Sequence, residues 1–177
     1  SSGELIMYAT DVFCNLHIIS EIVDAFEKNN IDYLHGGMLY QRDGKIIRRW
    51  RGKQGNWRLG WMMASPTLCY TRETWEKHGP YIEEYRASAD YDFQIKLFKD
   101  KSLKCKAICN PLVIFYAGGI SNGSIKLKWN AIKEGNRILH DNNVSFPAFT
   151  TFCKIVIAIF AYGLASHESV ELEEWMN

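Results

Sequence analysis

Short apolar runs alternate with amphipathic segments along most of this 177-residue chain. Residues 5–9 form an apolar run long enough for a buried strand, and apolar side chains recur at helical spacing over 15–29. Further helices are predicted at 72–78, 89–100 and 125–141, and further strands at 31–34, 38–40, 46–47, 105–109 and 112–116. Because strands alternate with helices, the chain is predicted to adopt an α/β fold.

Glycine and proline mark the expected breaks between these elements. Gly36-Gly37 interrupts one strand candidate and Asn110-Pro111 interrupts another, so two separate pieces are predicted in each case. Asp43-Gly44 is a strong signal for a hairpin turn. Gly79 is the residue type that usually follows the C-terminus of a helix.

The charge balance and the cysteines exclude several classes of protein. Lys and Arg number 21 against 20 Asp and Glu, which argues against a nucleic-acid binder. Apolar residues make up 47% and charged residues 23%, as in globular rather than disordered chains. The five cysteines are odd in number and scattered, so we expect reduced thiols in a cytoplasmic protein rather than a disulfide framework.

The C-terminal part differs in composition from the rest. Residues 146–165 hold a single charge, Lys154, and an acidic tail follows. The longest uncharged stretch there, 155–166, is too short to span a bilayer. We therefore expect two parts, an α/β portion over 1–145 and an apolar helix with its tail over 146–177. This helix is interpreted as a core helix, with the alternative that it lies in a membrane interface.

Three carboxylates are candidates for chemistry. Asp11 follows the first predicted strand, where α/β folds place ligands and where a carboxylate can hold Mg²⁺ together with substrate phosphates. Its alternative is an ordinary turn residue. Asp90 and Asp92 stand at a helix start, and their spacing turns them to different sides, so that one can face a site. The alternative is that Ser88 caps the helix and both acids favour its positive N-terminus.

Residues 52–66 are predicted to form a loop, and the stretch 57–67 with Trp57 and Trp61 is a candidate for substrate contact. Tryptophan can stack on the apolar face of a sugar ring, although it covers a hydrophobic core more often. The basic stretch 42–53 can attract a phosphorylated or lipid-linked anion, or form a solvated hairpin face. The histidines show no metal-ligand spacing.

These candidates lie in four stretches that follow one another along the chain: 3–13, 57–72, 76–92 and 118–122. Their central residues are Thr10-Asp11, Gly60-Trp61 with Pro66-Thr67, Ala89-Asp90-Tyr91-Asp92 and Gly118-Gly119-Ile120-Ser121. In this order they resemble the later part of bacterial family 2 glycosyltransferases of the GT-A type, in the branch that builds capsule and related surface polysaccharides. The resemblance covers most of residues 3–145 and does not include the family's first part, which holds the uridine pocket.

The resemblance implies a Rossmann-like mixed sheet flanked by helices, without the first βαβ units. It implies inverting transfer of a sugar from a nucleotide-sugar donor, a UDP-sugar, to a hydroxyl of a glycan or lipid-linked acceptor. Asp90 would be the general base, and Asp11 would hold a divalent metal, Mn²⁺ or Mg²⁺. Trp61, Ser65 and Asp92 would lie at the substrate.

Three positions depart from the family's pattern. Thr10 replaces the first of two adjacent Asp residues, and Ser65 stands where the family usually has His. Gly37 stands where the family usually has an Asp after the glycine that corresponds to Gly36. The alternative is therefore a non-catalytic relative that binds a glycan or a partner protein. The protein is expected in the cytoplasm. Residues 146–165 can contact the inner face of the membrane, and the chain can associate with itself; the sequence decides neither.

Overall fold

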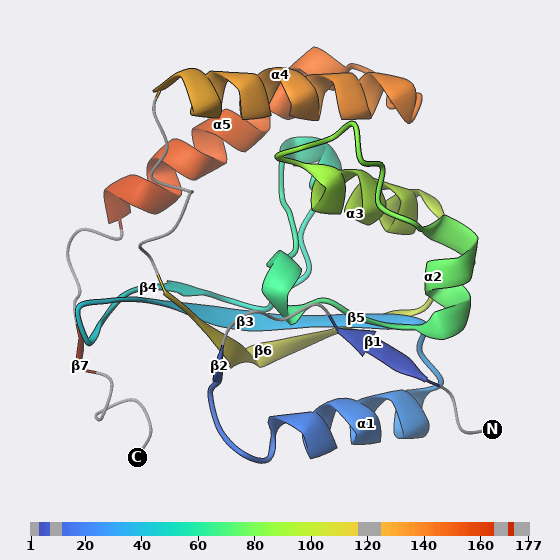
Figure 1. Ribbon diagram of the computed structural model, residues 1–177, viewed down its shortest axis with the longest axis vertical. Coiled ribbons are helices and arrows are strands. Elements are labelled where there is room, and N and C mark those ends of the chain that lie inside the picture. The colour runs from blue at the N-terminus through green and yellow to red at the C-terminus, as the bar shows by residue number, and fades with distance from the viewer. Residues whose placement is uncertain (1–3, 8–11, 117–124, 165–169, 172–177) are drawn as a thin grey trace.

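A mixed β-sheet with helices on both faces forms the centre of the molecule (Figure 1). The computed structural model describes residues 4–7, 12–116, 125–164 and 170–171. The strands are β1 (Leu5–Met7), β2 (Val12–Phe13), β3 (Tyr33–Arg42), β4 (Lys45–Trp50), β5 (Cys69–Thr71), β6 (Cys105–Tyr116) and β7 (Val170–Glu171). The helices are α1 (Ile18–Asn29), α2 (Arg72–His78), α3 (Ala89–Lys99), α4 (Ile125–Asp141) and α5 (Pro147–Leu164), with short 3₁₀ turns η1 (Trp57–Leu59) and η2 (Ser65–Thr67). The predicted α/β class is confirmed.

Strand β3 is the centre of the sheet and has three partners. It pairs in parallel with β6 along most of its length, from Tyr33 opposite Cys105 to Gln41 opposite Tyr116. Strands β5 and β4 pair antiparallel with its beginning and its end. Since β6 occupies one edge of β3, β5 and β4 share the other, and β1 extends the sheet beyond β5.

The predicted breaks in β3 and β6 are wrong, because both strands continue through them. A Cβ atom at Gly36 would lie 2.3 Å from Leu112 Cδ1, and one at Gly37 would lie 3.0 Å from the carbonyl oxygens of Asn110 and Trp50. The glycines therefore admit neighbouring chains at close range. The β3–β6 register shifts around Gly37 and Pro111, so the irregular residues change the pairing without ending the strands.

The hairpin between β3 and β4 confirms the turn predicted at Asp43-Gly44. Asp43 has a φ of 50° and Gly44 a φ of 79°. Two successive residues with positive φ make the turn that best matches the right-handed twist of the flanking strands.

Two hydrophobic clusters lie on opposite faces of the sheet, because successive side chains of a strand point to opposite sides. Leu34 packs with α1, where Ile18, Ile22 and Phe26 are buried. The neighbouring Tyr33 belongs to the other cluster, under α3 and α4. Figure 1 shows the same division, with α1 on one side of the sheet and α3, α4 and α5 on the other.

The helix boundaries agree with the prediction within three residues: α1 begins at Ile18 rather than at residue 15, and the cap of α3 is corrected. Gly79 follows the end of α2, and its amide donates to Trp75 O, as expected for the residue after a helix. Ser88 precedes α3, but its side chain makes no capping hydrogen bond. The hypothesis that the Ser88 side chain caps this helix is therefore wrong. Asp90 accepts a hydrogen bond from the first-turn amide of Tyr91 instead, at 2.9 Å.

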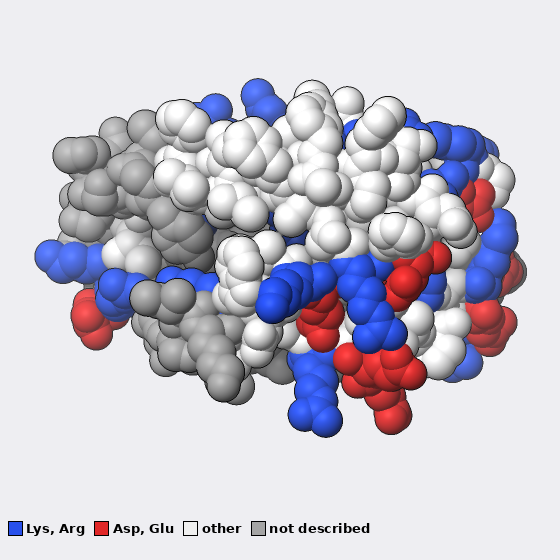
Figure 2. Space-filling view, turned by 90° about the horizontal axis from the view of Figure 1, so that it is seen from above, with Lys and Arg blue, Asp and Glu red and all other residues white. Residues whose placement is uncertain are grey.

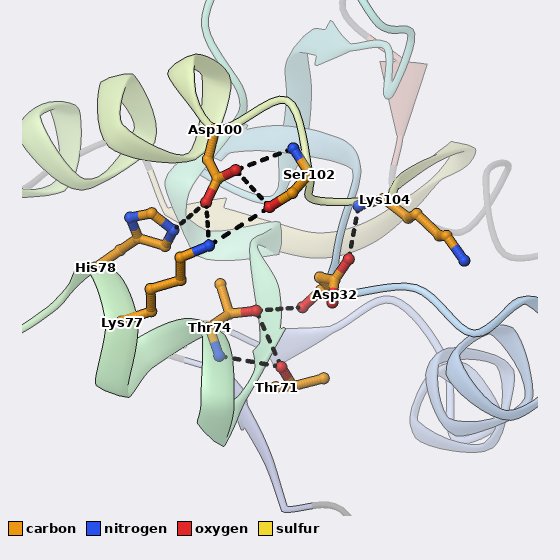
Figure 3. A network of polar contacts seen from close by, with 8 residues as sticks. All are labelled: Asp32, Thr71, Thr74, Lys77, His78, Asp100, Ser102 and Lys104. Carbon is orange, nitrogen blue, oxygen red and sulfur yellow. Dashed lines mark hydrogen bonds and ion pairs between the residues drawn. The ribbon is translucent and has the colours of Figure 1, made fainter.

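A polar network joins α2 and the end of α3 to the start of β3 (Figure 3). Asp100 accepts hydrogen bonds from Lys77 at 2.6 Å, from His78 at 3.0 Å and from the hydroxyl of Ser102 at 2.6 Å. The Lys77 hydrogen bond, followed by those of Ser102, lowers the pKa of Asp100 well below its usual range. Thr74 donates to the carbonyl oxygen of Asp32 at 3.2 Å. With these partners the network is interpreted as structural.

Helix α5 packs against η1 and α4. A Cβ atom at Gly60, which has a φ of 84°, would lie 2.3 Å from the backbone nitrogen of Lys154, so only glycine allows this approach. Thr150 donates a hydrogen bond to Arg58 O at 3.0 Å, and Thr151 donates to Asn136 Oδ1 at 3.1 Å. Over the residues that the structure describes, no helix has both the length and the apolar character to cross a bilayer.

Candidate functional site

Asp90 and Ser65, which the family resemblance places at one site, meet at the surface. Asp90 is exposed in the first turn of α3, and Ser65 begins η2. The Ser65 hydroxyl donates a hydrogen bond to Asp90 Oδ2, while the amide of Tyr91 donates to Oδ1. Both carboxylate oxygens therefore have a donor, and the carboxylate is held in one orientation at the start of a helix, whose dipole favours negative charge.

Gln94, one turn further along α3, holds the loop that carries Ser65. Its side chain is buried and forms two hydrogen bonds with the backbone of Met63, at 3.1 Å to the amide and 3.3 Å to the carbonyl oxygen. It also donates to Ser65 Oγ at 2.9 Å. Because the Ser65 oxygen accepts from Gln94, its own hydrogen is directed at Asp90. Sequence analysis missed Gln94, although its position four residues after Asp90 places both on one helix face.

Lys154 adds a cation from α5. The side chain is partly buried, and its Nζ lies 3.5 Å from the centroid of the Tyr91 ring. Burial lowers the pKa of Lys154 to about 8, and the nearby negative charge of Asp90 acts in the opposite direction. Sequence analysis gave Lys154 no role. Its signal was present, since it is the single charge between residues 146 and 165.

The lowered pKa of Lys154 predicts a pH dependence of stability. Between a pKa of about 8 in the folded chain and the ordinary 10.5, the unfolded chain holds a proton that the folded chain lacks. The free energy of unfolding should therefore rise with pH in this window, by roughly 1–3 kcal/mol relative to Lys154→Met. Urea unfolding of both proteins from pH 7 to 10 measures the difference. A constant difference would show that Lys154 is hydrated like a surface lysine.

The two tryptophans of residues 57–67 pack in or against the hydrophobic core. Trp57 is buried and stacks on Phe98, with ring centroids 6.1 Å apart. Trp61 is half-buried between His35 and Phe98, at centroid distances of 5.3 and 5.7 Å. The interpretation that tryptophan covers the hydrophobic core is therefore confirmed for Trp57. A contact of Trp61 with substrate stays a prediction. His35 is buried, and its Nε2 lies 3.0 Å from Gln54 Oε1.

The structure does not bring Asp92 together with Ser65. Asp92 is 1% exposed and lies between α3 and α4. Its Oδ2 forms an ion pair with Lys96 at 2.7 Å, and its Oδ1 accepts a hydrogen bond from Asn142 at 2.7 Å. The ion pair lies within α3, and the hydrogen bond from Asn142 joins α3 to the residue that follows α4. A role of Asp92 at the substrate stays a prediction with no support from its position.

The predicted metal ligand Asp11 lies outside the described residues, as does the 118–122 loop. Within the described part of the chain, no group of three or more His, Cys, Asp or Glu side chains is placed to hold a metal ion. The described residues therefore do not form a fitting site for Mn²⁺ or Mg²⁺ by themselves. Metal binding stays a prediction that depends on Asp11.

A cavity of about 860 Å³ lies elsewhere, between α1 and α2 near the start of β1. Its acidic lining residues are Glu4, Glu27, Asp32, Glu73 and Glu76. Arg72, its basic residue, forms ion pairs with Glu4 and Glu76. None of the predicted site residues that the structure describes lines this cavity, so we place the candidate site at Asp90 on the basis of its contacts.

Comparison with models of known protein families gives no match for this chain, and comparison with curated proteins gives none either.

Proposed function

We propose that this chain carries the acceptor side of an inverting glycosyltransferase of the GT-A type. The observation that carries the proposal is the exposed carboxylate of Asp90, oriented by the Ser65 hydroxyl, which Gln94 positions in turn. A mixed sheet with helices on both faces agrees with the architecture that the family resemblance implies. The donor would be a nucleotide-sugar such as a UDP-sugar, and the acceptor a hydroxyl of a glycan or lipid-linked sugar.

In the proposed reaction, Asp90 takes the proton of the acceptor hydroxyl while the acceptor oxygen attacks the anomeric carbon. The bond between that carbon and the diphosphate breaks, and the diphosphate leaves with the bonding electrons. Attack from the side opposite the leaving group inverts the configuration. A positioned base of this kind contributes roughly 10²–10⁴ in rate.

Ser65 and Lys154 would assist without exchanging protons with the substrate. The Ser65 hydrogen bond fixes the direction of the Asp90 carboxylate before the acceptor arrives. Lys154, in its charged form, supplies positive charge at a site that must attract a diphosphate. Ser65 stands where the family usually has histidine, so the resemblance alone does not define its role.

Calorimetric titration of the chain with UDP, with and without Mn²⁺, tests whether a donor site is present. Heat of binding that depends on the metal would show that this chain binds the donor, although the resemblance does not include the part of the family that holds the uridine pocket. Cytidine monophosphate is the control nucleotide. Absence of UDP binding under both conditions would contradict a working donor site in this chain. It would favour the alternative of a non-catalytic relative that binds a glycan or a partner protein.

A further inference from the structure

Over residues 147–160, helix α5 has its polar side chains Thr150, Thr151 and Lys154 on the side that faces the protein. Thr150 is buried and bonded to Arg58, Thr151 is bonded to Asn136, and Lys154 lies over the ring of Tyr91. In a helix on the surface of a water-soluble protein, these residues would normally face the solvent. The polarity of α5 is therefore reversed.

The outward side of α5 is apolar and aromatic. Phe149, Phe152, Ile159 and Phe160 recur at helical spacing, with exposed fractions between 55% and 67%. Phe146, just before the helix, is 80% exposed. Isolated exposed apolar residues are common, but a continuous stripe of large ones marks a surface that another apolar phase covers.

The start of α4 also exposes large apolar side chains. Figure 1 shows α4 and α5 running in opposite directions, so that the beginning of α4 and the end of α5 lie at the same end of the molecule. Leu127 and Trp129 are exposed there, and Lys133 Nζ lies 5.7 Å from the centroid of the Trp129 ring. Lys128 is exposed on the same stretch of α4. Seen from the α4 side, the molecule presents a broad area without charged residues, with charged side chains along its edges (Figure 2).

We propose that this surface binds an anionic lipid bilayer. Helix α5 would lie in the plane of the interface, with Phe152 and Phe160 among the acyl chains. Trp129 would lie at headgroup depth, and Lys128 and Lys133 would pair with lipid phosphates. The aromatic stripe and the neighbouring lysines together favour lipid over a second copy of the chain. In a dimer through this surface, the lysines of each copy would lie against the apolar stripe of the other, whereas an anionic bilayer offers phosphates to the lysines.

Co-sedimentation of the full chain with lipid vesicles tests the proposal. We expect the chain to pellet with vesicles of phosphatidylcholine and phosphatidylglycerol in equal parts, and more weakly with pure phosphatidylcholine. The double variant Phe152→Asp/Phe160→Asp should lower the partition coefficient at least about tenfold, because two aromatic side chains no longer enter the bilayer. The variant Lys128→Gln/Lys133→Gln should remove only the additional binding to the anionic vesicles.

A matched control is available on the opposite side of the sheet. Leu16 and Ile19 are also exposed apolar residues, and Leu16→Asp/Ile19→Asp should leave lipid binding unchanged. Failure of the wild-type chain to pellet, or equal losses in the two aspartate variants, would overturn the proposal. So would a wild-type dimer in sedimentation velocity that Phe152→Asp/Phe160→Asp dissociates, because the surface would then bind a second copy. The test needs no nucleotide, so its outcome is independent of the proposed transferase activity.

Discussion

If Asp90 is the general base of the proposed reaction, its replacement by asparagine is expected to lower the rate of sugar transfer by roughly 10²–10⁴, the contribution of a positioned base. Asparagine has nearly the same shape, and its amide oxygen can still accept the hydrogen bond that Ser65 donates. The variant loses only the hydrogen bond that Tyr91 N donates to the other oxygen, so the fold should be kept. The rate is measured as UDP release from the donor that the wild-type protein uses.

Asp43→Asn provides the control, because it makes the same chemical change in the exposed hairpin turn. Asparagine tolerates the positive φ of position 43, so this variant should keep the wild-type rate. If Asp90→Asn retained most of the activity, Asp90 would not be the base. Ser65→Ala should lower the rate less than Asp90→Asn, since it removes the orientation of the carboxylate and leaves the proton acceptor in place.

Replacement of Lys96 by methionine is expected to lower the free energy of unfolding by about 3–5 kcal/mol, the cost of leaving a buried charge without its partner. The Asp92 side chain that would remain is 2% exposed and keeps only the hydrogen bond from Asn142. Urea unfolding at neutral pH, followed by tryptophan fluorescence, measures the change. Adding Asp92→Leu to Lys96→Met should recover a large part of the loss, because the unpaired carboxylate is then gone.

The exposed pair Asp24–Lys28 is the matched control. It has the same residue types at the same helical spacing, but its side chains are 56% and 72% exposed. Lys28→Met should therefore change the free energy of unfolding by less than about 1 kcal/mol. Equal effects of Lys28→Met and Lys96→Met would show that burial does not determine the strength of these pairs.

Local sequence patterns predicted where the helices and strands of this fold lie, but they did not predict that β3 and β6 are each continuous. Apolar spacing and turn residues placed α4, α2 and the hairpin at Asp43-Gly44 where the structure has them. The glycine pair in β3 was interpreted as a break, because glycine is rare in strand interiors. Its actual cause is the approach of Leu112 from β6, a residue far away in sequence. No pattern within β3 contains that information.

The candidate site shows the same division. The family resemblance placed Asp90 and Ser65 at one site, but their hydrogen bond is seen only in the structure. The pairing of Asp92 with Lys96 was visible as an acid and a base four residues apart, but only burial between α3 and α4 shows its strength. Lys154 comes from the C-terminal helix, whose packing on η1 depends on the absence of a side chain at Gly60.

The central position of β3 has a consequence for how the chain reaches its native state. Its hairpin partner β4 follows directly, whereas its parallel partner β6 is synthesised about 70 residues later. At roughly 5–20 residues per second, translation leaves several seconds in which the β6 edge of β3 has no native neighbour. In the folded protein Leu34 clusters with Leu112 and Val113 of β6, and Leu39 with Ile114, so both side chains lack these neighbours during this interval. The interval before β6 emerges is therefore when a nascent chain of this protein is most open to aggregation and to binding by chaperones.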